Sequence, residues 1–183
     1  MTSPVTITRH TEVDRQEPMA PSIPRRGVSG SGSPHPDHTQ LTDVRGPIPD
    51  SYWVIPGKLA AGEYPGTEGR ETTRDKLERF LDAGLRVFID LTEEREFLRP
   101  YLPDLEDVAT ARGVEIRHHR MAIEDLGVPT KAHLRAILNL IDRCVADCRP
   151  AYVHCWGGIG RTGTVVGCWL SRNGFAGSSI APV

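Results

Sequence analysis

Apolar and polar positions alternate in a way that predicts strands and helices in turn between residues 51 and 174. Short apolar runs predict strands at 52–55, 59–61, 85–91, 114–116 and 151–153. Apolar residues three and four positions apart predict helices over 71–83, 104–112 and 162–173, and a further helix that Thr130 caps and whose apolar face extends to Val145. This order predicts an α/β domain with a mostly parallel central sheet flanked by helices.

The first 50 residues are different, because Pro, Ser, Thr and Gly dominate and no apolar period is present. They predict a disordered tail, followed by one domain over 51–183. The chain has no apolar segment of signal-peptide type and no run of 18 apolar residues, which favours a cytoplasmic protein without a membrane partner. A net charge of −2 argues against a nucleic-acid partner. Four cysteines in 183 residues do not suggest a disulfide framework.

The stretch 152–163 contains the strongest candidate chemistry. Cys155 lies between a short predicted strand and a glycine-rich turn. The turn ends at Arg161, just before a predicted helix. Glycines at 157, 158 and 160 allow the turn to direct several N–H groups toward one anion at the helix N-terminus. This positive environment favours the thiolate of Cys155 over its thiol. The guanidinium of Arg161 can hold two phosphate oxygens. The stretch therefore predicts a nucleophile beside an oxyanion site.

Residues 154–162, with the sequence HCWGGIGRT, resemble the signature loop of the cysteine-dependent protein-tyrosine phosphatase superfamily, which includes the dual-specificity phosphatases. Residues 53–65 also resemble the opening of bacterial members. The resemblance implies the cysteine-phosphatase fold, with Cys155 as nucleophile and neither metal nor organic cofactor. It implies that His154 orients the loop and that the Thr162 hydroxyl donates to the sulfur when the sulfur leaves in a second step, the hydrolysis of a cysteinyl-phosphate. The implied phosphate-binding residues are Trp156, Gly157, Gly158, Ile159, Gly160, Arg161 and Thr162.

Residues 121–130 resemble the general-acid loop of dual-specificity phosphatases, in which an Asp shortly before Gly-Val-Pro protonates the leaving oxygen. Asp125 matches that position, and Glu124 is the neighbour that could be mistaken for it. A second acidic stretch lies at 92–96. One of its carboxylates could support Arg161, but a solvated charged turn is the preferred interpretation.

Other functions fit the sequence less well. Residues 158–163 match the dinucleotide pattern G-x-G-x-x-G, but no acidic residue follows Asp147 to bind a ribose. A triphosphate-binding loop would need Lys where the chain has Arg161. A structural cysteine would leave Arg161 and the glycines without a purpose. Adjacent histidines at 118 and 119 point to opposite faces of a strand, so we expect no metal site there.

We therefore expect a tyrosine or dual-specificity protein phosphatase that acts on phosphorylated proteins through a cysteinyl-phosphate. Protein substrates are favoured because the loop at 156–160 carries no Lys of the kind found in inositol-lipid phosphatases. The alternatives are a catalytically weak phosphate-binding module and a truncated, inactive phosphatase. Only nine residues follow Gly174, whereas relatives continue with further helices. We therefore expect the last helix to be incompletely covered, leading to low stability, self-association through this face or low activity despite an intact motif. Its apolar residues are Val165, Val166, Trp169 and Leu170.

Overall fold

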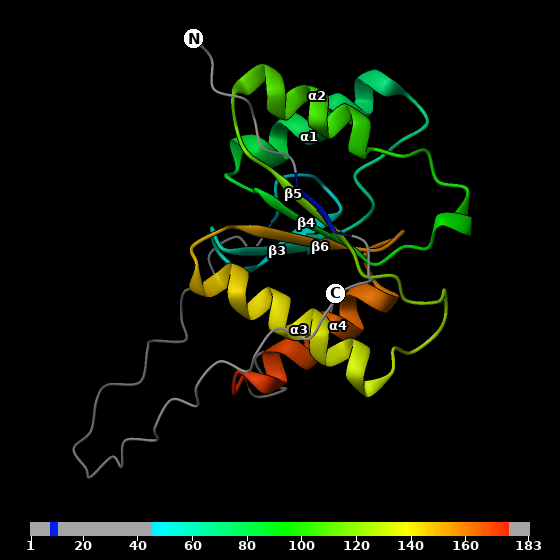
Figure 1. Ribbon diagram of the computed structural model, residues 1–183, viewed down its shortest axis with the longest axis vertical. Helices are drawn as coiled ribbons and strands as arrows, with labels where there is room; N and C mark the ends of the chain where they lie inside the picture. The colour runs from blue at the N-terminus through cyan, green and yellow to red at the C-terminus, as the bar shows by residue number, and fades with distance from the viewer. Residues whose placement is uncertain (1–7, 11–44, 176–183) are drawn as a thin grey trace, which may run out of the picture.

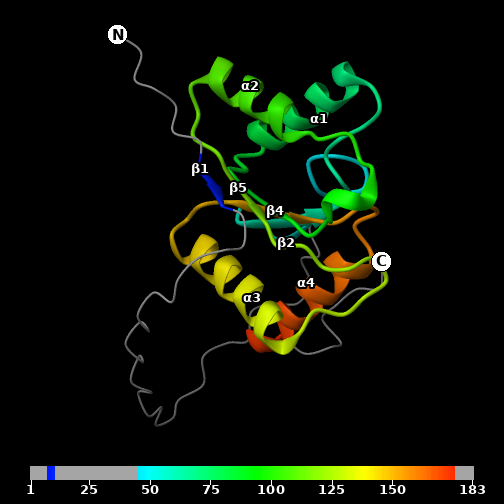
Figure 2. The ribbon, with the colours of Figure 1, turned by 45° about the vertical axis from the view of Figure 1, so that its right-hand side comes forward.

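The computed structural model of the chain describes residues 8–10 and 45–175. They form a six-stranded sheet in the order β1-β5-β4-β6-β3-β2 (Figures 1 and 2). The pair β2–β3 is antiparallel and every other neighbouring pair is parallel, so the predicted α/β class with a mostly parallel sheet is confirmed. The strands are β1 (Thr8–His10), β2 (Ser51–Ile55), β3 (Leu59–Gly62), β4 (Val87–Asp90), β5 (Arg117–Arg120) and β6 (Ala151–His154).

Two helices cover each face of the sheet (Figure 1). Helices α1 (Arg70–Asp82) and α2 (Leu102–Arg112) lie on one face, and α3 (Lys131–Ala146) and α4 (Gly160–Arg172) lie on the other. The alternation of side chains along a strand explains the two cores. In β6, Tyr152 packs with the α1 and α2 side, whereas Ala151 and Val153 pack with the α3 and α4 side. Within the described part of the chain, no helix has the length and hydropathy needed to cross a bilayer.

Several local predictions are confirmed by the helix ends. The side chain of Thr130 accepts a hydrogen bond from the His133 N–H at 3.2 Å, which caps α3 as expected. Helix α1 ends before Gly84, which has φ of 84°. Glycine adopts this left-handed conformation without steric cost because it has no Cβ. Gly113 ends α2 in the same left-handed conformation.

The expected boundary of the domain is wrong in two places. Strand β1 falls inside the segment predicted to be a disordered tail, where it pairs in parallel with β5 at the sheet edge. Order also begins before Ser51, because Arg45 bridges to Tyr52 and the side chain of Ile48 is buried. Three-residue edge strands bury too little apolar surface to produce a periodic signal. The other residues of the predicted tail, 1–7 and 11–44, lie outside the described part.

The strand predicted at 114–116 is displaced. Strand β5 instead covers Arg117–Arg120, a run with no apolar residue. The parallel pairing with β4 holds this segment in the sheet, and its buried residue is His118. Apolar periodicity could not find a strand whose buried side chain is polar.

The expectation that α4 lacks cover is also wrong. The side chains of Val165, Val166 and Trp169 are buried within the single chain, and Leu170 is half-buried. Helix α3 lies alongside α4 (Figures 1 and 2), and the indole N–H of Trp169 donates to Asp142 at 2.8 Å. The apolar face of α4 therefore supplies no reason for self-association. The predicted irregular C-terminal tail lies outside the described residues beyond Phe175.

Candidate active site

The predicted phosphate-binding loop lies at the carboxyl end of the parallel strands. Cys155 directly follows β6, and helix α4 begins at Gly160, two residues earlier than predicted. Arg161 therefore lies in the first turn of α4, where N–H groups without intrahelical partners and the helix dipole favour an anion. The side chain of Cys155 is buried, whereas Trp156 and Ile159 are exposed on the loop surface.

The loop rests on the hairpin formed by β2 and β3. Gly158 has φ of 74°, and a Cβ added there would lie 2.3 Å from the carbonyl carbon of Gly62. The Tyr64 N–H donates to the Trp156 carbonyl at 2.8 Å, which joins the loop to the segment after β3. Gly158 is therefore required both for its backbone conformation and for close approach to the hairpin. Gly157 has open space around it.

Arg161 is the centre of the site. Its buried guanidinium contacts both carboxylate oxygens of Glu96, with Nη2 to Oε2 at 2.8 Å. Nη1 also donates to the carbonyl of Ile123 at 3.1 Å. The hydrogen bonds to Glu96 raise the pKa of Arg161 despite its burial, and the charges of Cys155 and Asp125 add to this effect.

The contact between Arg161 and Glu96 corrects the preferred interpretation of the acidic stretch. Glu96 belongs to the short 3-10 helix η1 (Glu94–Glu96), and its side chain is not solvated but orients Arg161. Burial opposes ionisation of Glu96, but the hydrogen bonds from Arg161 and from the Glu93 backbone lower its pKa. The sequence signal was the acidic turn itself, which gave no indication of which carboxylate faces Arg161.

Asp125 and Glu124 lie in different environments. Asp125 Oδ1 is 3.2 Å from Arg161 Nη2, and its backbone N–H donates to Glu93 at 3.3 Å. Glu124 instead pairs with the exposed Arg95 at 3.4 Å. Of the two carboxylates that the sequence could confuse, only Asp125 contacts the guanidinium of Arg161. The structure therefore brings Asp125, from the loop before α3, to Arg161 in the first turn of α4.

The side chain of Thr162 is buried behind the loop. Its hydroxyl oxygen has no hydrogen-bond partner among the described residues, and its donation to a departing sulfur stays a prediction. A buried hydroxyl without a partner costs free energy of folding. In this state of the loop, Thr162 has donor capacity that the protein itself does not use.

Both ring nitrogens of the buried His154 have a hydrogen-bond partner. Its Nε2 lies 2.7 Å from the hydroxyl of Tyr101, and its Nδ1 lies 3.4 Å from the Cys155 carbonyl. Burial lowers the pKa of His154 to about 4, so the imidazole is neutral at pH 7. A neutral ring that accepts from Tyr101 and donates to the Cys155 carbonyl is suited to orienting the loop.

Sequence reasoning missed a buried polar cluster around Asp90. Asp90 is opposite His154 in the parallel pairing of β4 and β6, and one of its oxygens accepts from the hydroxyl of Thr92 at 2.6 Å. Arg120 donates to the other oxygen at 2.9 Å. Burial opposes ionisation of Asp90, but His154, Thr92 and Arg120 together hold its pKa well below the ordinary value. The only sequence signal was an acidic residue that ends an apolar strand.

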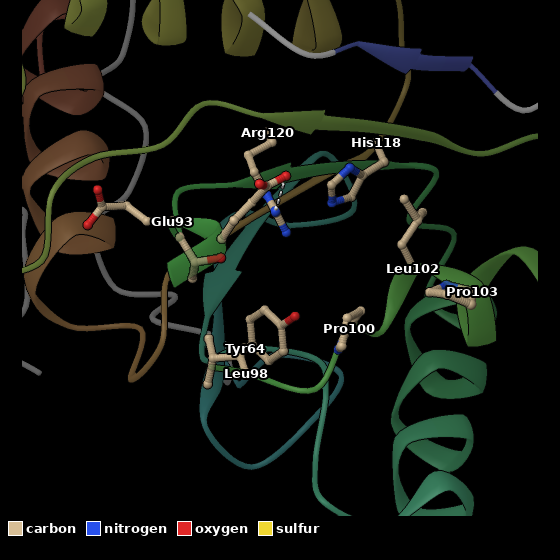
Figure 3. Close-up of a pocket in the computed structure, with 10 residues that line it drawn as sticks. Tyr64, Glu93, Leu98, Pro100, Leu102, Pro103, His118 and Arg120 are labelled. Atoms are coloured by element: carbon tan, nitrogen blue, oxygen red, sulfur yellow. Dashed lines mark ion pairs between the residues drawn. The ribbon is translucent and has the colours of Figure 1, made fainter. Parts of the chain in front are cut away.

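This cluster borders a pocket of about 470 Å³ between η1 and the start of α2. Figure 3 shows His118, Arg120 and Tyr64 directed toward its centre. None of the predicted catalytic residues belongs to its lining, which consists of Tyr64, Thr92, Glu93, Glu94, Leu98, Pro100, Leu102, Pro103, His118 and Arg120. Across residues 8–10 and 45–175, no three His, Cys, Asp or Glu side chains are grouped as a metal site would require.

Comparison with known families gives this geometry a context. Residues 63–175 match the family model Tc-R-P, described as a polymorphic toxin system DSP-PTPase phosphatase. The chain belongs to this family. The match contains Cys155, Arg161, Asp125 and Glu96, so these four residues of the candidate site lie within the DSP-PTPase phosphatase domain.

Individual relatives of this phosphatase domain are more distant. The human protein cyclin-dependent kinase inhibitor 3 is 24% identical over 143 residues, which cover 73% of this chain and 66% of that protein. The chain thus spans slightly less than two thirds of its human relative. Among solved structures, kinase associated phosphatase has a TM-score of 0.51 at 25% identity, covering 62% of this chain and 65% of the other. Tk-PTP in its active form has a TM-score of 0.52 at 25% identity, and the match covers 70% of this chain and 76% of Tk-PTP.

Exchange of Gly158 for Ala should destabilise the phosphatase domain. Its positive φ would cost about 1–3 kcal/mol for a residue with a Cβ, and overlap with Gly62 adds to that cost. Denaturant unfolding of the purified protein measures the loss. Gly157→Ala is the matched control, since nothing lies within 4 Å of a Cβ there. Equal stability of the two variants would contradict the packing of the loop on the hairpin.

The buried neutral His154 predicts a dependence of stability on pH. The pKa of His154 falls from 6.5 in its ordinary state to about 4 in the fold. Between these values the unfolded chain binds a proton that the folded chain does not, so the free energy of unfolding declines as pH falls. The loss from this residue reaches about 3 kcal/mol near pH 4.

Urea unfolding of the wild type and of His154→Asn at pH 7 and pH 4.5 isolates this contribution. We expect a smaller decline in the free energy of unfolding for His154→Asn than for the wild type. A decline of the same size in both proteins would show that protonation of His154 does not drive it.

Proposed function

We propose that this domain hydrolyses phosphomonoesters of proteins, on tyrosine or with dual specificity, through a phosphorylated Cys155. The observation that supports this proposal most directly is that Asp125 and the loop of Cys155 meet at the guanidinium of Arg161. Arg161, in the loop that begins with Cys155, contacts the carboxylate of Asp125 from a second loop. A nucleophile, an oxyanion site and an acid are the three groups that this chemistry requires.

In the first step, the thiolate of Cys155 attacks phosphorus and forms a sulfur–phosphorus bond. The bond from phosphorus to the leaving oxygen breaks, and Asp125 in its protonated form donates a proton to that oxygen. The phosphoryl oxygens are held by the N–H groups at the start of α4 and by Arg161. Because Asp125 contacts Arg161 in the absence of substrate, a phosphoryl group would compete for that contact and release the carboxyl toward the leaving group.

In the second step, water attacks phosphorus and the sulfur–phosphorus bond breaks. Asp125, now a carboxylate, accepts a proton from the water, and inorganic phosphate and the Cys155 thiolate are released. The unused hydroxyl of Thr162 is a donor for the departing sulfur if the loop adjusts when phosphate is bound.

Glu96 and His154 act as positioning residues in this mechanism. The contact of Glu96 with both terminal nitrogens of Arg161 fixes the plane of the guanidinium. His154 fixes the Cys155 carbonyl and remains neutral, so it takes no part in proton transfer. Both residues shape the oxyanion site without contacting the substrate.

A protein substrate is supported by the charge of the loop between Cys155 and Arg161. Residues 156–160 carry no basic side chain, so the loop provides no cation for a second phosphate. Kinase associated phosphatase, to which the fold is similar, is by its name a phosphatase associated with a kinase. The alternative is a phosphate-binding module with weak activity, which the engagement of Arg161 by Glu96 and Asp125 in the free protein would favour.

Replacement of Cys155 by Ser tests the proposal against this alternative. We expect loss of at least about 99% of phosphate release from p-nitrophenyl phosphate, since hydroxyl is a poor nucleophile beside thiolate. Binding of inorganic phosphate, measured by calorimetry, should persist because Arg161 and the loop remain. Wild-type protein that binds phosphate without turnover would identify the binding module instead.

Replacement of Asp125 by Asn tests the general acid. Its loss should slow hydrolysis of an alkyl phosphate by about 10²–10⁴-fold, and that of p-nitrophenyl phosphate less, because nitrophenolate leaves without a proton. Glu124→Gln is the matched control and should behave as wild type, given its pairing with Arg95. Steady-state kinetics on the two esters measure the difference. The reverse result would assign the acid to Glu124.

A further inference from the structure

Large exposed apolar side chains are not scattered over this domain. In residues 45–175 there are six, namely Phe97, Leu126, Val128, Trp156, Ile159 and Phe175. The first five belong to three loops that surround Arg161, and we call these five the apolar rim. Single exposed apolar residues need no explanation, but their concentration around one site indicates an interaction surface.

The rim residues are adjacent or close in sequence to residues of the candidate site. Phe97 directly follows Glu96, and Leu126 directly follows Asp125, two residues whose carboxylates contact Arg161. Trp156 and Ile159 lie between Cys155 and Arg161 in the sequence. Figures 1 and 2 show the three loops at the same edge of the sheet, beyond the carboxyl ends of β4 and β6.

The backbone at two rim positions is unfavourable for the residues it carries. Phe97 has φ of 54° and Leu126 has φ of 58°, and both are bulky residues in the left-handed region. Their side chains are 98% exposed, so neither gains burial within the fold that would offset this strain. Stability of the isolated domain does not account for Phe or Leu at these positions, whereas contact with a ligand does.

The charges next to the rim indicate the kind of ligand. Glu94 and Glu124 are exposed beside it and lie 3.6 Å from Arg120 and 3.4 Å from Arg95, and Arg95 also pairs with Glu93. The loop at 156–160 carries no charge. Because Arg95 and Arg120 already face carboxylates, this surface favours one phosphate surrounded by apolar groups over an anionic membrane or a ligand with several phosphates.

We propose that the apolar rim recognises a phosphorylated polypeptide segment that carries large apolar side chains on either side of the phosphorylated residue. The phosphate occupies the loop of Cys155 and Arg161, and the flanking side chains contact Phe97 and Leu126 on the adjoining loops. This proposal rests on the proposed phosphatase function, since it specifies the substrate of that same site.

Two phosphotyrosine peptides of equal length test the rim, one with Leu and Phe beside the phosphotyrosine and one with Ser and Gly there. The wild-type chain should show a kcat/KM about tenfold or more higher for the apolar peptide, within the range that apolar contacts supply. The double variant Phe97→Asn with Leu126→Asn should lose this preference, because Asn tolerates the left-handed backbone but offers no apolar surface. Activity on p-nitrophenyl phosphate serves as the reference for each protein.

Phe175→Asn is the matched control, because it removes an exposed apolar residue outside the rim and should retain the preference. Absence of a preference in the wild type, or its persistence in the double variant, would overturn the proposal. A membrane role would be indicated by a different result. In that case the wild type would bind phosphatidylcholine vesicles, the double variant would not, and neither protein would prefer the apolar peptide.

Binding of both peptides to Cys155→Ser keeps this test independent of turnover. If the wild type hydrolyses none of the three substrates, the proposed phosphatase activity fails. Tighter binding of the apolar peptide to Cys155→Ser would still support the rim, and equal binding of the two peptides would reject it.

Discussion

The buried ion pair between Arg161 and Glu96 is the constraint on which the candidate site depends. The side chain of Arg161 is only 4% exposed, so its guanidinium requires a counter-charge and hydrogen-bond acceptors, since an unpaired buried charge is strongly destabilising. Glu96 supplies both, and the carbonyls of Leu91 and Ile123 accept the remaining Nη1 contacts. Arg161 thereby joins the N-terminus of α4 to the segment after β4 and to the loop that contains Ile123 and Asp125. Three loops distant in sequence are held around one side chain.

Most of the fold could be predicted because its elements bury apolar residues at regular spacing. The hairpin of β2 and β3, the helix capped by Thr130 and the strand before Cys155 all follow from local pattern. The prediction failed where burial involves polar groups. Strand β5 was placed three residues too early because its inward side chain is His118, and β1 was missed because three edge residues form no period.

In the candidate site, too, local motifs could be read from the sequence, whereas long-range polar contacts could not. The loop motif selected Cys155 and Arg161 as candidates by their spacing, and the resemblance around Gly127 selected Asp125, which the structure places 3.2 Å from Arg161. Glu96 could not be selected among the neighbouring acids, because the register of a 3-10 turn decides which carboxylate faces inward. The role of Tyr101 behind His154 was not predictable, since that contact joins positions 53 residues apart. Long-range polar contacts leave no periodic trace in a sequence.

The hairpin beneath the loop has a consequence for the smallest chain able to form this site. The family match begins at Glu63, yet the backbone that Gly158 touches belongs to Gly62, at the end of β3. Tyr152 also donates to the Glu63 carbonyl at 2.7 Å, and the Glu63 N–H donates to Asp50 at 3.0 Å. A chain that started at Glu63 would keep every residue of the motif and lose the surface against which the loop is shaped. The segment needed to shape the candidate site is therefore longer than the segment that the family model matches.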